Sequence, residues 1–146
     1  MKIDIQRITE GEESLVLRYK EATPTINRIL DILRDQDNRI WGRIDGETVV
    51  VNREDILYLE SVDEKVFAYT KDKVLRLDGS LTSFLMETGD DTFFRASKSV
   101  VINVNRVISL KSLPSNRIDI TMEGDEHLII SRRYASEFRR LLRGEG

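Results

Sequence analysis

The sequence predicts a mainly β protein with few helices, in which a small β-β-α unit (residues 1–45) precedes an antiparallel sheet assembly (residues 46–146). From Ile40 onward, short alternations of apolar and polar residues are separated by tight turns, a pattern typical of antiparallel sheets. Before residue 40, two alternating segments are followed by apolar residues at helical spacing. The length of 146 residues suits one domain with a short additional unit.

The N-terminal unit is predicted from local patterns. Residues 2–8 and 14–19 alternate as half-buried strands do, and residues 9–13 form a turn between them. Thr23 and Pro24 mark a helix start, because Thr caps helix N-termini and Pro suits the first helical position. A unit this small buries little core by itself. We therefore expect it to complete the sheet of the following domain or to serve in dimerisation or partner docking.

After residue 40 the pattern predicts many short strands and two helices. The strands are expected at residues 40–44, 48–51, 55–62, 66–70, 74–77, 93–104, 107–113, 117–122 and 127–130. Asp45-Gly46 is a strong hairpin signal between the first two strands. The helices are expected at residues 81–88 and from residue 132 to about residue 142, with apolar faces made by Leu81, Phe84 and Leu85 and by Tyr134, Phe138, Leu141 and Leu142.

The composition excludes several classes of site. The chain has no cysteine and one histidine, so disulfides, thiolate metal sites and multi-histidine metal sites are excluded, and no cofactor is predicted. The longest apolar runs fall short of the roughly 18 residues that span a bilayer, and the first residues lack a secretory signal pattern. These features favour a cytoplasmic protein.

No motif in the sequence indicates an enzyme. There is no Gly-x-Ser-x-Gly elbow and no glycine-rich phosphate loop. His127 lies in a predicted strand beside acidic residues, which favours a surface histidine over a general base. The pair Asp90-Asp91 suits a solvated turn. Ser97, Ser99 and Ser131 have no partner base in the sequence around them.

Charge is distributed unevenly along the chain. The net charge is −3, made up of −1 over residues 1–45, −6 over residues 46–94 and +4 over residues 95–146. The C-terminal third is therefore the expected face for a polyanion. The alternative is an uneven but merely solvated surface.

Two cationic clusters lie in this basic third. Arg132 and Arg133 follow Ser131, a candidate N-cap, and occupy the first turn of the last helix, where cations oppose the helix dipole. Bound phosphate would explain them, because helix N-termini offer free N–H groups and Arg adds bidentate donors. The second cluster, residues 95–99 (Arg-Ala-Ser-Lys-Ser), interrupts an apolar stretch with donors that suit phosphate oxygens. For both clusters, ordinary solvated side chains are the alternative.

Three segments carry a resemblance to a known family. They are Asp55-Ile56-Leu57-Tyr58-Leu59-Glu60-Ser61, then Phe94-Arg95-Ala96-Ser97-Lys98-Ser99-Val100-Val101-Ile102-Asn103, then Ile130-Ser131-Arg132-Arg133-Tyr134. In this order and spacing, residues 49–142 resemble the LytTR-type DNA-binding domain of bacterial response regulators. The resemblance implies small, mostly antiparallel sheets stacked in a row. It also implies binding of duplex DNA through loops placed in successive major grooves, without a recognition helix.

The resemblance assigns roles to residues of this chain. It implies a base contact from Lys65 in the turn that begins at Asp63-Glu64, contacts of Ser97, Lys98 and Ser99 with the DNA backbone or the intervening groove, and base contacts from Arg133, with Arg132 beside it. Arg95 is expected to tie the second loop down, and Asn103 to fill a buried turn role.

This sequence departs from the family pattern in two ways. Many members carry histidine near the first loop or in the second segment, where this chain has Lys65 and Lys98, so its base preference is open. Many members also carry an N-terminal receiver domain, whereas about 45 residues precede the match here. The chain is similar to stand-alone members, which are often paired with a small membrane protein. Family members bind two half-sites, which implies a homodimer or paired monomers. The alternative function is a protein-interaction module of the same fold without DNA binding.

Overall fold

The computed structural model of the chain describes residues 1–88 and 92–144. Its internal contacts divide the chain into two units, Met1–Gln36 and Asp37–Gly146. The strand β1 (Arg39–Ile44) belongs with the second unit, whereas the division drawn from the sequence placed these residues in the first. The acidic pair Asp90-Asp91 lies outside the described residues.

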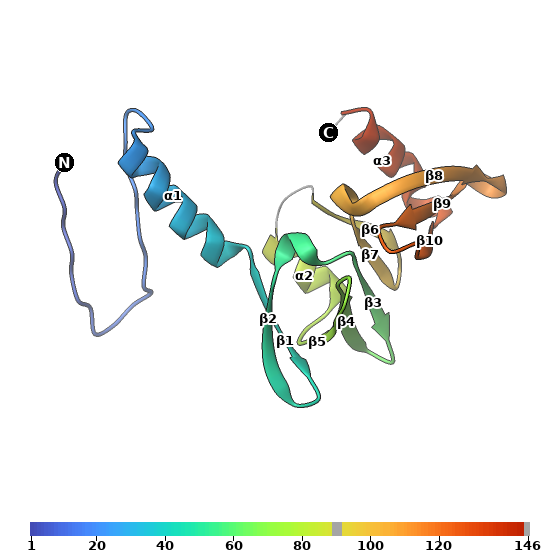
Figure 1. Cartoon of the computed structure of the whole chain (residues 1–146), viewed down its shortest axis with the longest axis horizontal. Helices are drawn as coiled ribbons and strands as arrows, with labels where there is room; N and C mark the ends of the chain where they lie inside the picture. The colour runs from blue at the N-terminus through green and yellow to red at the C-terminus, as the bar shows by residue number, and fades with distance from the viewer. Residues whose placement is uncertain (89–91, 145–146) are drawn as a thin grey trace. The chain divides into compact units, whose positions relative to one another are not determined.

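In the first unit only the helix forms. Helix α1 (Pro24–Asp37) begins as predicted, and the Thr23 Oγ1 accepts the Ile26 amide at 3.3 Å. The strands predicted for residues 2–8 and 14–19 are wrong for the single chain, because both segments run as irregular extended chain (Figure 1). No backbone–backbone hydrogen bond joins residues within 1–20 of the described chain. The physical reason is that an isolated two-stranded hairpin is at best marginally stable in water.

Among its described residues, the second unit forms two antiparallel sheets together with the α-helices α2 and α3 (Figure 1). The larger sheet has the strand order β2-β1-β5-β4-β3-β7-β6, and the smaller has the order β10-β9-β8. The remaining bounds are β2 (Glu47–Asn52), β3 (Tyr58–Val62), β4 (Lys65–Tyr69), β5 (Val74–Leu77), α2 (Leu81–Thr88), β6 (Phe93–Ser97), β7 (Val100–Asn103), β8 (Val107–Leu113), β9 (Arg117–Met122), β10 (His127–Ile130) and α3 (Arg132–Leu142).

Turn residues fix the ends of these strands. Asp45 and Gly46 both have positive φ, of 50° and 82°, which confirms the predicted two-residue hairpin between β1 and β2. Asp63 and Glu64 also have positive φ, of 50° and 64°, and form the tight turn between β3 and β4. The single strand predicted for residues 55–62 instead begins at Tyr58, because Arg53–Asp55 form a 3-10 turn.

Side chains alternate between the two faces of the larger sheet, and each face contributes to a separate hydrophobic core. The larger sheet therefore lies as the middle layer, with one core on each side. One core packs the sheet against α2; its buried members are Ile56, Leu59, Val66, Ala68, Leu75, Leu77, Leu81, Phe84, Phe93 and Val101. The other packs the opposite sheet face against the smaller sheet and α3; its buried members are Leu57, Tyr58, Ala96, Ile102, Ile118, Ile120, Met122, Ile130, Ala135 and Phe138. This arrangement confirms the predicted mainly β fold of stacked antiparallel sheets.

The apolar face of α3 differs at two positions from the prediction. Phe138 is fully buried, and Tyr134 and Leu141 pack partly against the same core, as expected. Leu142 is 48% exposed, whereas Ala135, which the pattern did not select, is fully buried. Leu142 is the last residue of the helix, whereas Ala135 lies within the core between the sheets and α3.

Candidate nucleic-acid interface

The predicted contact segment Ser97-Lys98-Ser99 forms the turn between β6 and β7. The extended run predicted for residues 93–104 is therefore a hairpin, with an irregular register between Arg95 and Ser97. Lys98 and Ser99 are exposed and Ser97 is half-buried. The polar residues stand where the chain must leave the sheet, so their side chains face solvent and not the core.

Arg95 holds this turn in place. Its Nε donates to the Ser97 carbonyl at 3.0 Å and its Nη2 donates to the Lys98 carbonyl at 2.6 Å. Its Nη1 donates to the Thr82 hydroxyl of α2 at 3.1 Å. The expected structural role of Arg95 is thus confirmed. These hydrogen bonds fix the carbonyls of the turn, so Lys98 is presented on an ordered backbone.

The start of α3 lies directly against the same hairpin. The Ser131 amide donates to the Ala96 carbonyl at 2.8 Å, which joins the first residue before the helix to β6. An open groove of about 630 Å³ results, lined by Arg95, Ser97, Lys98, Ser99, Ser131, Arg133 and Tyr134. Two cationic clusters separated by more than thirty residues therefore face one surface.

In the described chain, the first turn of α3 has free backbone amides and no acidic side chain, which favours a bound anion. Ser131 occupies the predicted N-cap position, but its side chain makes no capping hydrogen bond. Its carbonyl accepts the Tyr134 and Ala135 amides, and within the described chain no acceptor is found for the amides of Arg132 and Arg133. The first turn contains no acidic residue. The free amides and the helix dipole together favour negative charge at this end.

The cations at this surface are exposed and lack carboxylate partners. Arg132, Arg133 and Lys98 are exposed, and none forms an ion pair within the part of the chain that the structure describes. The Arg133 guanidinium lies 5.4 Å from the centre of the Tyr134 ring, which restrains it through a cation–π contact. The groove thus has unpaired donors on both sides.

Lys65 lies at the same end of the sheet but outside the groove. The Ser61 amide donates to the Ser99 carbonyl at 2.8 Å, so the β3–β4 turn adjoins the β6–β7 turn. Lys65 pairs with Val62 across β3 and β4, which places it two strands, or about 10 Å, from β7. It is exposed and follows the acidic residues Asp63 and Glu64. The positive charge of the groove therefore rests on Arg95, Lys98 and Arg133, whereas Arg132 is exposed beside Arg133 but is not part of the lining.

Asn103 has the buried turn role expected for it. Its side chain is 1% exposed, and its Nδ2 donates to the Ile56 carbonyl at 2.9 Å. Its Oδ1 accepts the Asn105 amide at 3.0 Å. It therefore joins the end of β7 to the segment before β3 and is not available to a ligand.

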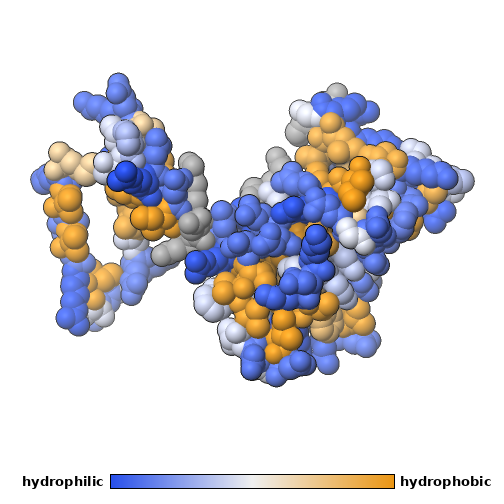
Figure 2. Space-filling view, in the orientation of Figure 1, coloured by the Kyte–Doolittle hydropathy of each residue, from blue (hydrophilic) through white to orange (hydrophobic). Residues whose placement is uncertain are grey.

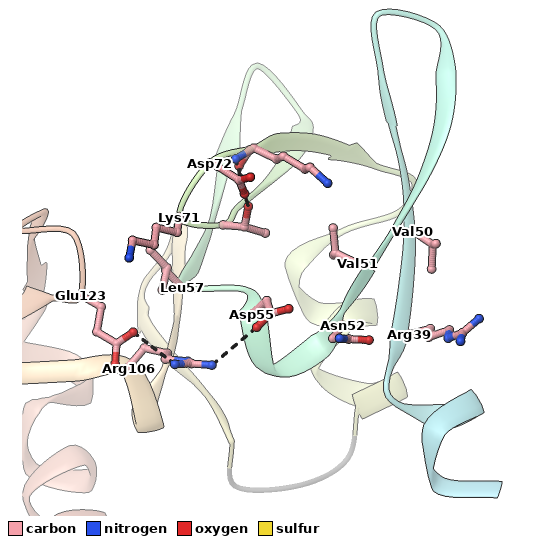
Figure 3. Close-up of a pocket in the computed structure, with 12 residues that line it drawn as sticks. Arg39, Val50, Val51, Asn52, Asp55, Leu57, Lys71, Asp72, Arg106 and Glu123 are labelled. Atoms are coloured by element: carbon pink, nitrogen blue, oxygen red, sulfur yellow. Dashed lines mark hydrogen bonds and ion pairs between the residues drawn. The ribbon is translucent and has the colours of Figure 1, made fainter. Parts of the chain in front are cut away.

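A second concavity of about 440 Å³ lies between the β2 strand and the β4–β5 turn (Figure 3). At its floor Arg106 holds Asp55 at 3.7 Å and Glu123 at 3.2 Å. The Arg106 Nε also donates to the Glu54 carbonyl at 2.9 Å. The Arg106 guanidinium is therefore already engaged by two carboxylates, and the residues that line this concavity include neither a histidine nor a cysteine.

Among the described residues, the remaining titratable groups do not gather into a metal site. His127 is exposed on β10, with its Nδ1 3.2 Å from the Asp119 carboxylate, as suits the predicted surface histidine. Within the described ranges, no three His, Asp or Glu side chains are placed to hold a metal ion. No helix of residues 1–88 and 92–144 is long and apolar enough to cross a membrane.

Residues 46–143 match the family described as the LytTr DNA-binding domain. The chain belongs to this LytTR family. It is 28% identical over 100 residues to the sensory transduction protein LytT of Bacillus cereus, and 25% identical over 137 residues to the transcriptional regulatory protein YpdB of Escherichia coli strain K12. A solved LytTr DNA-binding domain from Bacillus cereus superposes with a TM-score of 0.69 at 25% identity, covering 72% of this chain and 96% of that one.

The LytTR match contains the whole groove but not the first unit. The aligned parts make up 68% of this chain and 41% of LytT, and 93% of this chain and 56% of YpdB, so the chain spans about half the length of these relatives. Sequence reasoning selected Lys98 and Arg133 but gave Tyr134 only a packing role. Its position next to Arg133 was the available signal, since a half-buried aromatic there can orient the guanidinium.

Proposed function

We propose that this LytTR chain binds duplex DNA sequence-specifically and regulates transcription. The observation that supports the proposal is the single groove that joins Lys98 of the β6–β7 turn to Arg133 at the start of α3. Phosphate binding needs exposed donors without carboxylate partners, and the groove supplies them on both walls. The proposal assigns no catalytic step and no cofactor to the chain.

Loops, and not a recognition helix, would enter the major groove. One face of α3 packs against the core through Ala135 and Phe138, both fully buried, and only the start of the helix lines the groove. In this arrangement Ser97, Lys98, Ser99 and Arg132 contact phosphates, whereas Arg133 contacts base edges, as Arg commonly does at guanine. Lys65 adds a base contact from the neighbouring β3–β4 turn.

The proposed DNA binding implies a second copy of the chain as a partner. Two copies of the groove would bind two half-sites, so we propose a homodimer on DNA. A small membrane protein that controls the regulator stays a prediction from the resemblance to stand-alone members. A cytoplasmic location suits both partners.

The experiment begins with selection of bound duplexes from a random pool, which yields the preferred sequence and its half-site spacing. Binding to the selected duplex is then measured by fluorescence anisotropy over a range of salt concentrations. Lys98→Ala should weaken binding to all sequences and reduce the salt slope by about one counterion. Arg133→Ala should cost roughly 1–3 kcal/mol and relax specificity at one base pair.

A matched control comes from Lys71, an exposed lysine in the turn at the opposite end of β4. Lys71→Ala removes the same charge but should leave the affinity and the salt slope unchanged. Parent-like binding by both Lys98→Ala and Arg133→Ala would reject the interface.

A protein-interaction module without DNA binding is the second candidate. Asp63 and Glu64 beside Lys65 favour it, as does the −6 net charge of residues 46–94, because both repel phosphate. Failure to enrich any duplex from the random pool at low salt would select this alternative over the regulator.

A further inference from the structure

The alternating segment of residues 2–8 has a strand-forming sequence but pairs with no strand among the described residues. Ile3 is 75% exposed and Ile5 is 89% exposed. Figure 2 shows hydrophobic side chains along the extended N-terminal stretch and on one side of α1. Among residues 1–33, Ile26 is the only buried side chain. An extended segment with unpaired backbone hydrogen-bonding groups and exposed apolar side chains is a template for pairing with another strand.

Residues 14–19 of the same chain can pair with only one of the two hydrogen-bonding edges of residues 2–8. With the turn at residues 9–13, Ile5 would face Leu17 and Asp4 would face Arg18, which gives a favourable apolar pair and a favourable charge pair. Such a hairpin would still leave the outer edge of residues 2–8 open. Two strands alone are marginal, whereas three or more strands with one apolar face can be stable.

We propose that residues 2–8 of two copies of this chain pair antiparallel about Ile5 and hold the protein as a homodimer. In this register Ile5 faces itself, Ile3 faces Arg7 and Asp4 faces Gln6, so no like charges oppose. Parallel in-register pairing would instead place Lys2, Asp4 and Arg7 each opposite its own copy, which is destabilising. The charges of the segment therefore select an antiparallel second copy.

The pairing brings the exposed apolar residues of both copies onto one face of a single sheet. Two hairpins joined through residues 2–8 make a four-stranded sheet, whose one face carries Ile3, Ile5, Leu15, Leu17 and Tyr19 from each copy. Arg7 lies on the same face, where its aliphatic stem packs beside these residues while its guanidinium reaches water. The apolar side of α1, which includes the 62% exposed Ile32, follows in the same unit and can cover that face. The dimer itself requires no DNA, although two linked grooves would serve the proposed function on paired half-sites.

The first test uses the absence of cysteine from the chain. Directly opposed residues in an antiparallel pair have Cα atoms about 4.5–5.5 Å apart, which lies within the range of a disulfide. Full-length protein carrying Ile5→Cys, treated with diamide as the thiol oxidant, should form a covalent dimer on a non-reducing gel. Met86→Cys, at a 79% exposed position on α2, is the matched control.

At about 10 μM protein, pairing raises the local thiol concentration to about 1 mM, so the Ile5→Cys protein should cross-link about 100-fold faster than the control. Equal rates for the two variants would overturn the pairing.

The second test uses charge and needs no covalent bond. In light scattering without DNA, the parent should have twice the chain mass of 16.9 kDa. Ile5→Lys and Ile5→Asp should each be monomeric, because a like charge then opposes itself, and a 1:1 mixture of the two should restore the dimer. A monomeric parent, or a mixture that stays monomeric, would overturn the proposal.

Mass and DNA affinity are separate readouts. A dimer that binds no duplex contradicts only the proposed function, and a monomeric parent that binds one half-site contradicts only the pairing.

Discussion

Arg95→Lys tests whether the β6–β7 turn must be held in place before it meets DNA. The substitution keeps the positive charge but replaces a planar group with three engaged nitrogens by a single ammonium. Lysine can reach one of the two turn carbonyls at most. The variant therefore separates the positioning role of Arg95 from its contribution to the electrostatic field.

The size of the effect follows from the hydrogen bonds lost. Two of the three bonds, at 3.0 and 2.6 Å to Ser97 and Lys98 and 3.1 Å to Thr82, should be lost. At about 0.5–1.5 kcal/mol each, the loss amounts to about 1–3 kcal/mol. If the loosened turn must be ordered again on binding, the affinity for the selected duplex falls by about 5- to 150-fold. The salt slope should not change, because the charge is retained.

Fluorescence anisotropy at several salt concentrations measures both quantities, and far-ultraviolet circular dichroism checks that the variant is folded. Arg76→Lys is the matched control, since Arg76 is an exposed arginine on β5 that does not line the groove. A folded Arg95→Lys protein with parental affinity at every salt concentration would refute the reasoning. A changed salt slope at reduced affinity would show that Arg95 acts by charge.

Two further predictions concern stability. Asn103→Ala should lower the free energy of unfolding by about 2–3 kcal/mol in urea denaturation, because it leaves the buried Ile56 carbonyl without its donor, whereas Asn105→Ala at the exposed neighbouring position should change it by less than about 0.5 kcal/mol. Burial, and then the Glu126 carboxylate, raise the pKa of Tyr58 from 10.0 to about 12, so the unfolded chain loses the phenol proton first. Stability should therefore fall as the pH rises from about 10 to about 12, and Tyr58→Phe should lose less stability than the parent between about pH 9 and about pH 11.

Much of the second unit could be predicted from the sequence because its signals are local. The bounds of β5, β8, β9, β10, α2 and α3 agree with the alternation and helical spacing that predicted them. The hairpin at Asp45-Gly46 likewise depends only on residues that tolerate positive φ. The failures lie where local pattern needs a distant partner. Residues 2–8 and 14–19 alternate like strands, yet no strand in the described part of the single chain pairs with them.

The sequence by itself determined which side chains can bind an anion, because charge, donors and turn residues are properties of the chain. Only the tertiary structure decided that Lys98 and Arg133 line one groove, since that depends on the hydrogen bond from Ser131 to Ala96 and on the packing of Phe138. It also decided that Lys65 stands two strands away from β7. The physical reason is that strand order and helix docking follow from burial summed over two whole cores, which no single segment of the sequence contains.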